Sequence, residues 1–284
     1  MSPSKRTILI TGCSDGGMGA ALAAEFHRSG LHVIATARKI SSMSSLASLD
    51  GIEILPLDIT SKDSIQNILS KVDKLDILLN NAGAAFNMPI SDVSIDEAKD
   101  LFDINVWGHL AITQAFLPLL RKSPKAMIVN HTSIGASLII PFQAVYNASK
   151  AAMSTFTQTL RIELQPFDIA VVELKTGGVK TNVIKNNRTK GASLPESSIY
   201  APAKDAAEDL ASGQWAEEHL NMKPEDWARA VTVELLKGNP PPVISKGDSV
   251  WTAWIGNFIP YGWLDATTKK LTGLAKVEEL IRRA

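Results

Sequence analysis

The stretch TILITGCSDGGMGAAL (residues 7–22) places a β-branched apolar run, a glycine-rich turn and an alanine-rich segment in immediate succession. The apolar run predicts a buried strand, and the alanines that follow the turn predict a helix. At such a junction the free backbone N–H groups and the helix dipole favour a bound phosphate. The stretch therefore predicts the opening strand, turn and helix of a dinucleotide-binding fold.

The glycine turn is one residue longer than the common TGxxxGxG spacing, and Asp15 falls in the additional length. We expect an Asx-type turn to aim the Asp15 carboxylate away from the phosphates. The alternative is a flexible turn that binds nothing. If the turn holds a dinucleotide, the expected contacts are at Gly12, Ser14, Gly17, Met18 and Gly19.

Short apolar runs alternate with helix-like segments over most of the 284 residues, as in a parallel sheet covered on both faces. The predicted strands are 7–11, 32–37, 52–58, 75–81, 126–132, 169–175 and 241–245. The predicted helices cover 19–29, a segment that starts after Thr60 or Ser61, about 96–121, and 144–165. We therefore predict one α/β domain over residues 1–284, a Rossmann-type doubly wound fold with a seven-stranded parallel sheet.

The alternation breaks after Lys175, where a polar, helix-prone segment occupies residues 182–227. Ligands of open α/β sheets bind beyond the carboxyl ends of the strands, so an insertion after the sixth strand can cover that crevice. We interpret 182–227 as a substrate lid and 247–284 as a C-terminal extension. A plain surface excursion is the alternative for the lid.

Composition excludes several classes of protein. The chain has 29 Lys+Arg and 29 Asp+Glu, and zero net charge argues against a nucleic-acid partner. The single cysteine, Cys13, cannot form an internal disulfide and is interpreted as a packing residue rather than a nucleophile. No signal-peptide pattern opens the chain, so we expect a cytoplasmic protein. The five histidines are scattered without metal-ligand spacing, so no metal is expected.

The end of the second predicted strand indicates which dinucleotide is bound. It reads IATARK (34–39), with Arg38 and Lys39 where NAD-binding folds place an acid for the adenosine ribose. An arginine can pair with a 2′-phosphate that a carboxylate would repel. The cofactor is therefore expected to be NADP(H). A solvated surface arginine is the alternative.

Four further motifs follow in order. They are LPLDIT (55–60), LDILLNNAG (75–83), INVWGHL (104–110) and TSIGASLIIPFQAVYNASK (132–150). The last contains a Ser–Tyr gap of thirteen residues and a YxxxK spacing. With the glycine turn, these motifs resemble the short-chain dehydrogenase/reductase family from about residue 6 to residue 182.

The catalytic chemistry follows from this resemblance and from residue spacing. Tyr146 can donate a proton to a carbonyl oxygen, and Lys150 lies one helical turn further on the same face. We expect Lys150, together with the oxidised nicotinamide, to lower the pKa of Tyr146. The resemblance also implies that Lys150 holds the nicotinamide ribose. Ser133 is expected to orient the substrate oxygen, and Asn105 to anchor a water that links Lys150 to solvent.

The resemblance also implies further cofactor contacts. Asp58 would meet the adenine ring, and Asn81 would lie beside the adenosine and support the central strand. In TGGVKT (176–181) Thr176 stands where the family usually has proline. Val179 and Thr181 keep the positions that contact the carboxamide and phosphate ends of the cofactor.

The long glycine turn, the TGGV element and the tail look most like a subgroup related to acyl-dihydroxyacetone-phosphate reductases and retinol or steroid dehydrogenases. A set of large apolar side chains in the lid and tail suggests a bulky lipophilic substrate: Trp215, Met222, Trp227, Trp251, Trp254, Phe258 and Trp263. They equally fit a role in packing the lid and tail onto the body. The segment 250–264 is too short and too interrupted to span a membrane. It leaves open a pocket wall, a subunit contact or a membrane-surface patch.

The surplus of apolar residues on the 96–121 helix fits the homodimers that related proteins form through this helix. The sequence therefore predicts an NADPH-dependent carbonyl reductase for a lipophilic ketone or aldehyde, with reduction as the expected direction. The alternative is a non-redox use of the scaffold, as an NADP(H)-binding regulatory protein or a rearrangement or cyclisation enzyme.

Overall fold

The computed structural model describes residues 5–182, 193–213 and 220–284, except for 257 and 261. Its centre is a seven-stranded sheet in the order β3-β2-β1-β4-β5-β6-β7, with every neighbouring pair parallel. The strands are β1 (Thr7–Thr11), β2 (His32–Ala37), β3 (Ile52–Pro56), β4 (Ile77–Asn80), β5 (Met127–Ser133), β6 (Ala170–Thr176) and β7 (Val243–Lys246). The predicted Rossmann-type α/β fold is confirmed, and the order reverses between β1 and β4.

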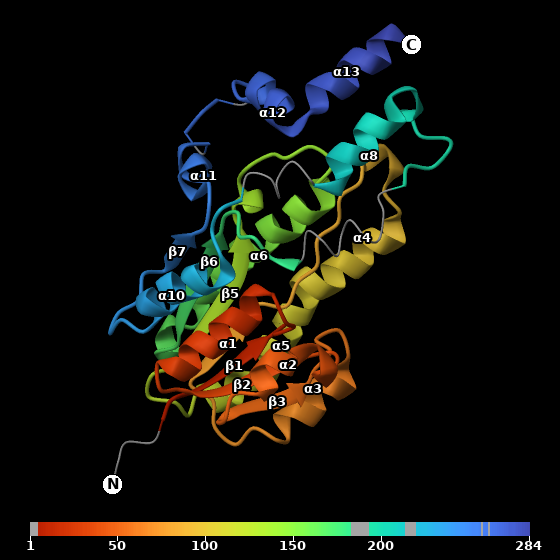
Figure 1. Ribbon diagram of the computed structural model, residues 1–284. Helices are drawn as coiled ribbons and strands as arrows, with labels where there is room; N and C mark the ends of the chain where they lie inside the picture. Colours follow the sequence, from red (N-terminus) through yellow and green to blue (C-terminus); the bar gives the residue numbers. More distant parts are fainter. Residues whose placement is uncertain (1–4, 183–192, 214–219, 257, 261) are drawn as a thin grey trace.

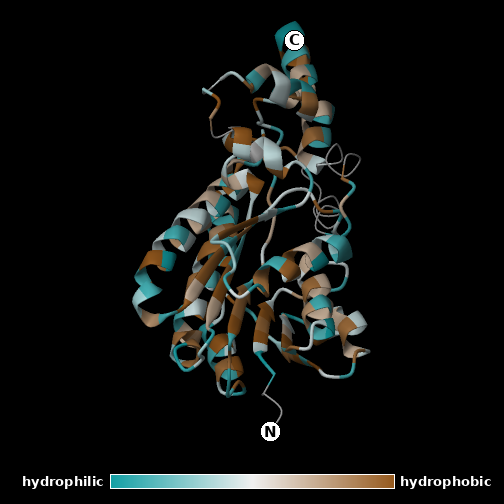
Figure 2. Cartoon of the chain, turned by 90° about the vertical axis from the view of Figure 1, so that its left-hand side faces the viewer, coloured by the Kyte–Doolittle hydropathy of each residue, from teal (hydrophilic) through white to brown (hydrophobic). Residues whose placement is uncertain are grey.

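Helices cover both faces of the sheet (Figure 1). One face carries α1 (Met18–Arg28), α2 (Ser44–Ala47) and α10 (Pro224–Leu235). The other carries α3 (Lys62–Leu69), α5 (Gly108–Leu120) and α6 (Ala144–Glu163). Successive strand residues alternate between the two apolar cores, so Ile8 and Ile10 join the first core and Leu9 joins the second. Figure 2 shows the consequence: the strands are coloured as hydrophobic and lie between helices whose outer faces are hydrophilic.

Two local details refine the predicted helices. Of the two predicted caps of α3, Ser61 is the one used, because its side chain accepts a hydrogen bond from the backbone N–H of Ser64 at 3.2 Å. The expected single helix over 96–121 consists of α4 (Ile95–Phe102), a π-helical turn (Asp103–Trp107) and α5. π-Helical turns concentrate at functional sites, and this one contains Asn105.

The insertion and the tail lie beyond the carboxyl ends of the strands (Figure 1). They contribute α8 (Lys204–Ser212), α11 (Val250–Gly256), α12 (Asp265–Thr272) and α13 (Leu274–Arg283). Part of α8 and α13 packs with the loop before α6 in a third apolar cluster, whose buried members are Phe142, Leu194, Ala203, Ala207, Leu210, Ala211 and Val277. Short 3₁₀ turns complete the chain: Ile40–Met43, Ile90–Asp92, Ile134–Ala136, Gln165–Phe167 and Ala201–Ala203.

The large apolar residues of the insertion and tail do not form one group. Trp227 belongs to α10, is fully buried and stacks on His131 at 5.3 Å between ring centroids, so it packs the body rather than a lid. Met222 packs against the same core. The tail side chains Trp251, Trp254, Phe258 and Trp263 are exposed. Trp215 lies outside the described residues. None of the described helices combines the length and the apolar character that a membrane crossing requires.

Candidate active site

The glycine turn between β1 and α1 brings backbone from two strands into close contact. Gly12 adopts φ +74°, and a Cβ there would come within 2.6 Å of the Cα of Ala82, which follows β4. A Cβ on Gly19 would overlap the carbonyl of Gly12 and the side-chain amide of Asn81. Only glycine fits either position. No side chain caps the helix at Gly17, so the first N–H groups of α1 are left for a ligand of the turn.

Asp15 points away from this turn, as expected, but its hydrogen bonds are not those of an Asx turn. Its carboxylate accepts from the backbone N–H groups of Ser44 at 2.9 Å and Ser45 at 3.1 Å, and from both serine hydroxyls. These residues begin α2. Asp15, the additional residue of the turn, therefore connects the turn to the start of α2.

Asn81 joins the ends of β1 and β4 and reaches towards β5. Its amide nitrogen donates to the carbonyls of Thr11 at 2.8 Å and Gly12 at 3.0 Å. Its amide oxygen is therefore turned to Nδ1 of His131, 2.9 Å away. The other ring nitrogen of His131 lies 2.7 Å from the hydroxyl of Thr176. Asn81 thus supports the central strand and, through His131, the end of β6.

Two charged residues mark the end of the cavity beside β2. Arg38 follows β2, and Asp58 lies beyond β3. Burial alone would raise the pKa of Asp58, but two hydrogen bonds from Thr60 and the charge of Arg38 outweigh it and hold the pKa below its usual value. Asp58 is therefore ionised at neutral pH, and it lies close enough to Arg38 for the guanidinium charge to help lower its pKa.

Tyr146 and Lys150 lie on one face of α6, and Ser133 ends β5 opposite them. The Lys150 ammonium lies 5.8 Å from the centre of the Tyr146 ring and donates to the backbone carbonyl of His131 at 3.2 Å. The three candidate catalytic side chains thus converge from a helix and a strand end.

In the protein alone the pKa of Tyr146 is raised, and the lowering expected from Lys150 together with the oxidised nicotinamide stays a prediction. Burial raises the pKa of Tyr146, and the hydrogen bond with the Ser133 hydroxyl only partly offsets that effect. Burial also lowers the pKa of Lys150 to about 8. Among the protein's own groups, desolvation therefore outweighs the attraction that the spacing predicted, since both side chains leave water when α6 packs onto the sheet.

Asn105 is fully buried in the π-helical turn. Its side chain exchanges two hydrogen bonds of 2.9 Å with the backbone of Ala84 and donates to the Ser149 hydroxyl at 3.1 Å. Both ends of the amide are therefore engaged in holding the loop after β4 against α6. The water relay expected of Asn105 remains a prediction.

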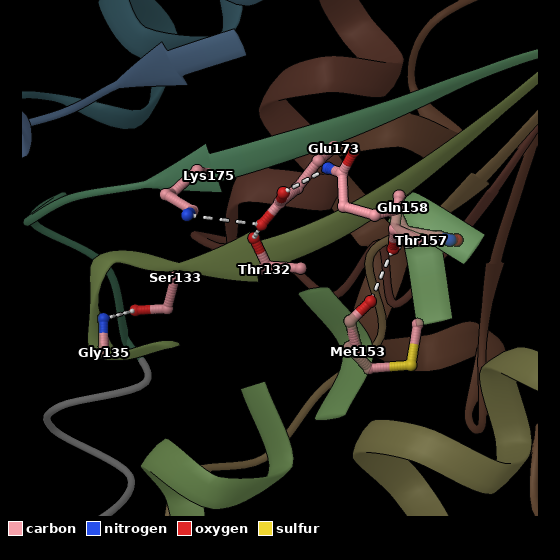
Figure 3. A network of polar contacts seen from close by, with 9 residues as sticks. Thr132, Ser133, Gly135, Met153, Thr157, Gln158, Glu173 and Lys175 are labelled. Atoms are coloured by element: carbon pink, nitrogen blue, oxygen red, sulfur yellow. Dashed lines mark hydrogen bonds and ion pairs between the residues drawn. The ribbon is translucent and has the colours of Figure 1, made fainter. Parts of the chain in front are cut away.

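A buried polar network supports the strand end that carries Ser133 (Figure 3). The Glu173 carboxylate accepts from the Thr132 hydroxyl at 2.8 Å and from the Gln158 amide at 2.9 Å, and pairs with Lys175 at 3.7 Å. The Ser133 hydroxyl accepts from the backbone N–H of Gly135 at 3.0 Å. β5, β6 and α6 thus hold the strand end beside Ser133 together, while the contact of the Ser133 hydroxyl with Gly135 is local.

These features border one cavity of about 400 Å³ at the β1/β4 reversal. Most of the predicted site residues line it: Gly12, Ser14, Gly17, Met18, Arg38, Asp58, Asn81, Ser133, Tyr146 and Lys150. Four predicted residues do not line the cavity. Gly19 packs against Gly12, Asn105 is buried in the π-helical turn, and Val179 and Thr181 are buried. The lining also includes His131, Thr176 and Asn182, for which the sequence predicts no role in the site. The spacing of motifs carries no signal for His131 or Asn182.

Other chemistries find less support in the described residues. Among them, no three His, Cys, Asp or Glu side chains are grouped as metal ligands. Cys13 is buried, its thiol lies 3.3 Å from the carbonyl of Ile10, and burial raises its pKa to about 12. Its thiol stays protonated at neutral pH and is a poor nucleophile.

Comparison with known proteins agrees with this geometry. Residues 6–192 match the family profile described as short chain dehydrogenase. A short-chain dehydrogenase/reductase of Pestalotiopsis microspora is 46% identical over 286 residues, with 100% of both chains covered. An NADPH-dependent 1-acyldihydroxyacetone phosphate reductase of Schizosaccharomyces pombe is 40% identical over 206 residues, covering 70% of this chain and 69% of that protein. A solved short-chain dehydrogenase from Streptomyces avermitilis superposes with a TM-score of 0.75 at 28% identity, covering 98% of each chain.

Proposed function

The chain belongs to the short-chain dehydrogenase family, and on that premise we propose that it is an NADP(H)-dependent carbonyl reductase for a lipophilic ketone or aldehyde. One observation carries the proposal. Ser133, Tyr146 and Lys150 line the same cavity as the glycine turn, so a hydride donor and a proton donor can meet at one carbonyl. A non-redox protein has no need for this complete set.

The preference for NADP(H) is supported by charge. Arg38 lines the cavity after β2, no acid stands at that strand end, and an arginine can bind a 2′-phosphate bidentately. The relative from Schizosaccharomyces pombe is described as NADPH-dependent. The rest of the cavity also suits a dinucleotide, since the uncapped start of α1 can bind the pyrophosphate and Lys150 can hold the ribose.

The proposed reaction places one proton and one hydride on a carbonyl. When bound in this cavity, NADPH would supply a hydride for the carbonyl carbon and become NADP⁺. Tyr146 donates its phenolic proton to the carbonyl oxygen, the C=O π bond breaks, and an alcohol forms. The Ser133 hydroxyl donates a hydrogen bond to the same oxygen and orients it. Lys150 stabilises the phenolate that Tyr146 becomes, which matters more because burial has raised the pKa of Tyr146.

The lipophilic substrate is proposed from the surroundings of the cavity. Part of the predicted lid packs against the segment that leads into Tyr146, with the Phe142 and Tyr200 rings in an edge contact at 5.1 Å. The apolar side chains of Ile139 and Ile199 stay exposed in this region. The exposed tryptophans of α11 offer further apolar surface, either to the substrate or to a lipid surface. Apolar side chains beside the segment that leads into Tyr146 fit a bulky ligand that avoids water.

A homodimer is proposed from the outer surface of α4 to α6. Large apolar side chains there are exposed, including Ile95, Trp107, Ile162 and Phe167. Trp107 contacts Phe156 of α6 at 6.1 Å between centroids, so two helices form one apolar surface. Light scattering after size exclusion should give twice the chain mass for the wild type and a monomer for Trp107→Glu. A monomeric wild type would refute the dimer.

The decisive test follows NADPH oxidation by the purified protein with a panel of lipophilic ketones and aldehydes, beside Tyr146→Phe. Turnover that requires Tyr146, with NADPH binding retained in the variant, supports the proposal. Full activity of Tyr146→Phe refutes its role as proton donor. NADPH binding by the wild type without turnover would mean either a narrow substrate outside the panel or the non-redox alternative, and product analysis with candidate intermediates would then separate the two.

A further inference from the structure

The side chain of Asp15 fastens the glycine turn to the segment after β2. Asp15 Oδ2 accepts from the backbone N–H of Ser44 at 2.9 Å and from its hydroxyl at 2.6 Å. Oδ1 accepts from the backbone N–H of Ser45 at 3.1 Å and from the Ser45 hydroxyl. Four donors on one carboxylate make a strong, directional connection between segments about 30 residues apart in sequence.

The same two segments meet at further points. The backbone N–H of Asp15 donates to the carbonyl of Ser42 at 2.7 Å, and the hydroxyls of Ser14 and Ser42 lie 3.1 Å apart. The Ser42 hydroxyl donates to the carbonyl of Lys39 at 2.7 Å. The turn is thus connected, residue by residue, to the stretch that begins with Arg38.

These contacts lie at the edge of the nucleotide cavity. Ser14, Asp15 and Arg38 all line it. A free carboxylate beside a 2′-phosphate would repel it, since two like charges a few ångströms apart interact unfavourably. The serines remove that conflict, because they orient the Asp15 carboxylate towards α2 and supply hydrogen bonds to its charge.

We propose that Asp15 is a positioning residue for NADP(H), which sets the separation of Ser14 and Arg38 on the two sides of the 2′-phosphate. The inference rests on the proposed use of NADP(H). Asp15 itself does not touch the phosphate. Its carboxylate holds α2, and α2 holds the stretch from Arg38 to Ser42 at the distance that the phosphate requires.

Substituting the side chain of Asp15 separates its connection to α2 from the backbone contacts of the glycine turn. The backbone carbonyl of Asp15 accepts separately from the Asn182 side chain at 3.3 Å, and its N–H contact to Ser42 also belongs to the backbone. Asp15→Ala therefore removes the connection to α2 without removing these contacts. Asp15→Asn keeps one acceptor oxygen but presents an amide NH₂ to donors on the other side.

The test compares dissociation constants for NADPH and NADH, measured by nucleotide fluorescence, in the wild type, Asp15→Ala, Asp15→Asn and Ser44→Ala/Ser45→Ala. Asp15→Ala is expected to weaken NADPH binding about ten-fold and NADH binding by less than about three-fold. Asp15→Asn and the serine double variant should fall between it and the wild type. Asp50→Ala, which changes an exposed carboxylate shortly after α2, is the matched control and should match the wild type.

A second measurement uses nucleotide fragments, so that catalysis plays no part. Binding of 2′,5′-ADP should weaken in Asp15→Ala, whereas binding of 5′-AMP should not. Equal losses for phosphorylated and unphosphorylated ligands would show a general structural role and overturn the inference. Unchanged affinities in every variant would overturn it too.

The wild type separates this inference from the proposed function. If it binds NADPH more tightly than NADH and Asp15→Ala keeps that preference, only the role of Asp15 is wrong. If the wild type shows no preference, the proposed cofactor is wrong and the role of Asp15 falls with it. Asp15→Asn provides the comparison if Asp15→Ala fails to fold.

Discussion

The hydroxyl of Thr176 donates a hydrogen bond to Nε2 of His131 across 2.7 Å. The direction follows from the opposite side of the ring, where Nδ1 faces the amide oxygen of Asn81 and must donate. Burial first, and then the charge of Lys150, holds the pKa of His131 well below its usual value, so the ring is neutral and Nε2 is free to accept. This contact connects the end of β6 to the strand end beneath the catalytic residues.

Replacing that hydroxyl should destabilise the protein. Thr176→Val leaves the buried Nε2 of His131 without its donor, at a cost of about 1–3 kcal/mol in the free energy of unfolding. Thr176→Ser keeps the donor and should lose less. Urea denaturation of the three proteins measures the difference, and equal stability of Val and Ser variants would contradict the assigned direction.

Gly19→Ala should impair both stability and nucleotide binding. The new methyl group would overlap the carbonyl of Gly12 and the amide of Asn81, so α1 must shift away from the turn. Overpacking of this kind costs about 1–3 kcal/mol. Gly238→Ala is the control, because nothing lies within 4 Å of a Cβ there. Melting curves and NADPH titrations compare the two variants. If Gly19→Ala had the melting temperature and NADPH affinity of the wild type, the close approach at Gly19 would be refuted.

The pH dependence of reduction should reflect Lys150. Burial lowers its pKa to about 8, so the ammonium is present below that pH and is lost above it. Tyr146 keeps its proton over the same range, because burial raises its pKa. The value of kcat/KM for NADPH should therefore fall about ten-fold per pH unit above pH 8.

A matched variant tests this assignment. Lys150→Arg keeps a positive charge at all accessible pH values, so the falling limb should move to higher pH even if the rate drops. Lys150→Met should lose most of the activity at every pH. An unchanged limb in Lys150→Arg would assign the titration to another group.

Acid should destabilise the fold through its buried histidines. Nε2 of His109 lies 2.6 Å from the carbonyl oxygen of Ala82. Burial, with a smaller effect of the Lys150 charge, lowers the pKa of His109 to about 3. A histidine in the unfolded chain binds a proton as the pH falls through about 6.5, whereas the buried histidine of the folded state does not. Stability should fall by about 1.4 kcal/mol per pH unit below 6.5 for each such histidine.

His109→Gln removes one of these groups and keeps a donor for Ala82. Its free energy of unfolding should change less between pH 6.5 and pH 5 than that of the wild type, as measured by urea denaturation at each pH. The pH dependence of stability that remains in His109→Gln is due in part to His131, whose pKa is also lowered by burial. Identical slopes would show that His109 is not protonated on unfolding in this range.

Much of the site was predictable because its signals are local. The apolar runs predict the strands, and the spacing of glycines and of Tyr146 and Lys150 predicts which strand ends and which helix face carry the chemistry. Since the carboxyl ends of parallel strands meet at one edge of a sheet, the order of motifs also predicts that they share a cavity. Ser133, Tyr146, Lys150 and Arg38 do line it.

What the sequence determined by itself was therefore the sheet, the turn and the set of residues at the crevice, because each depends on near neighbours in the chain. Only the tertiary structure decided that Asp15 binds Ser44 and Ser45, and that Trp227 is buried against His131. It also decided that, among the protein's own groups, burial raises the pKa of Tyr146. Each of these depends on groups from distant segments and on the loss of water when they pack, and neither quantity is encoded in local spacing.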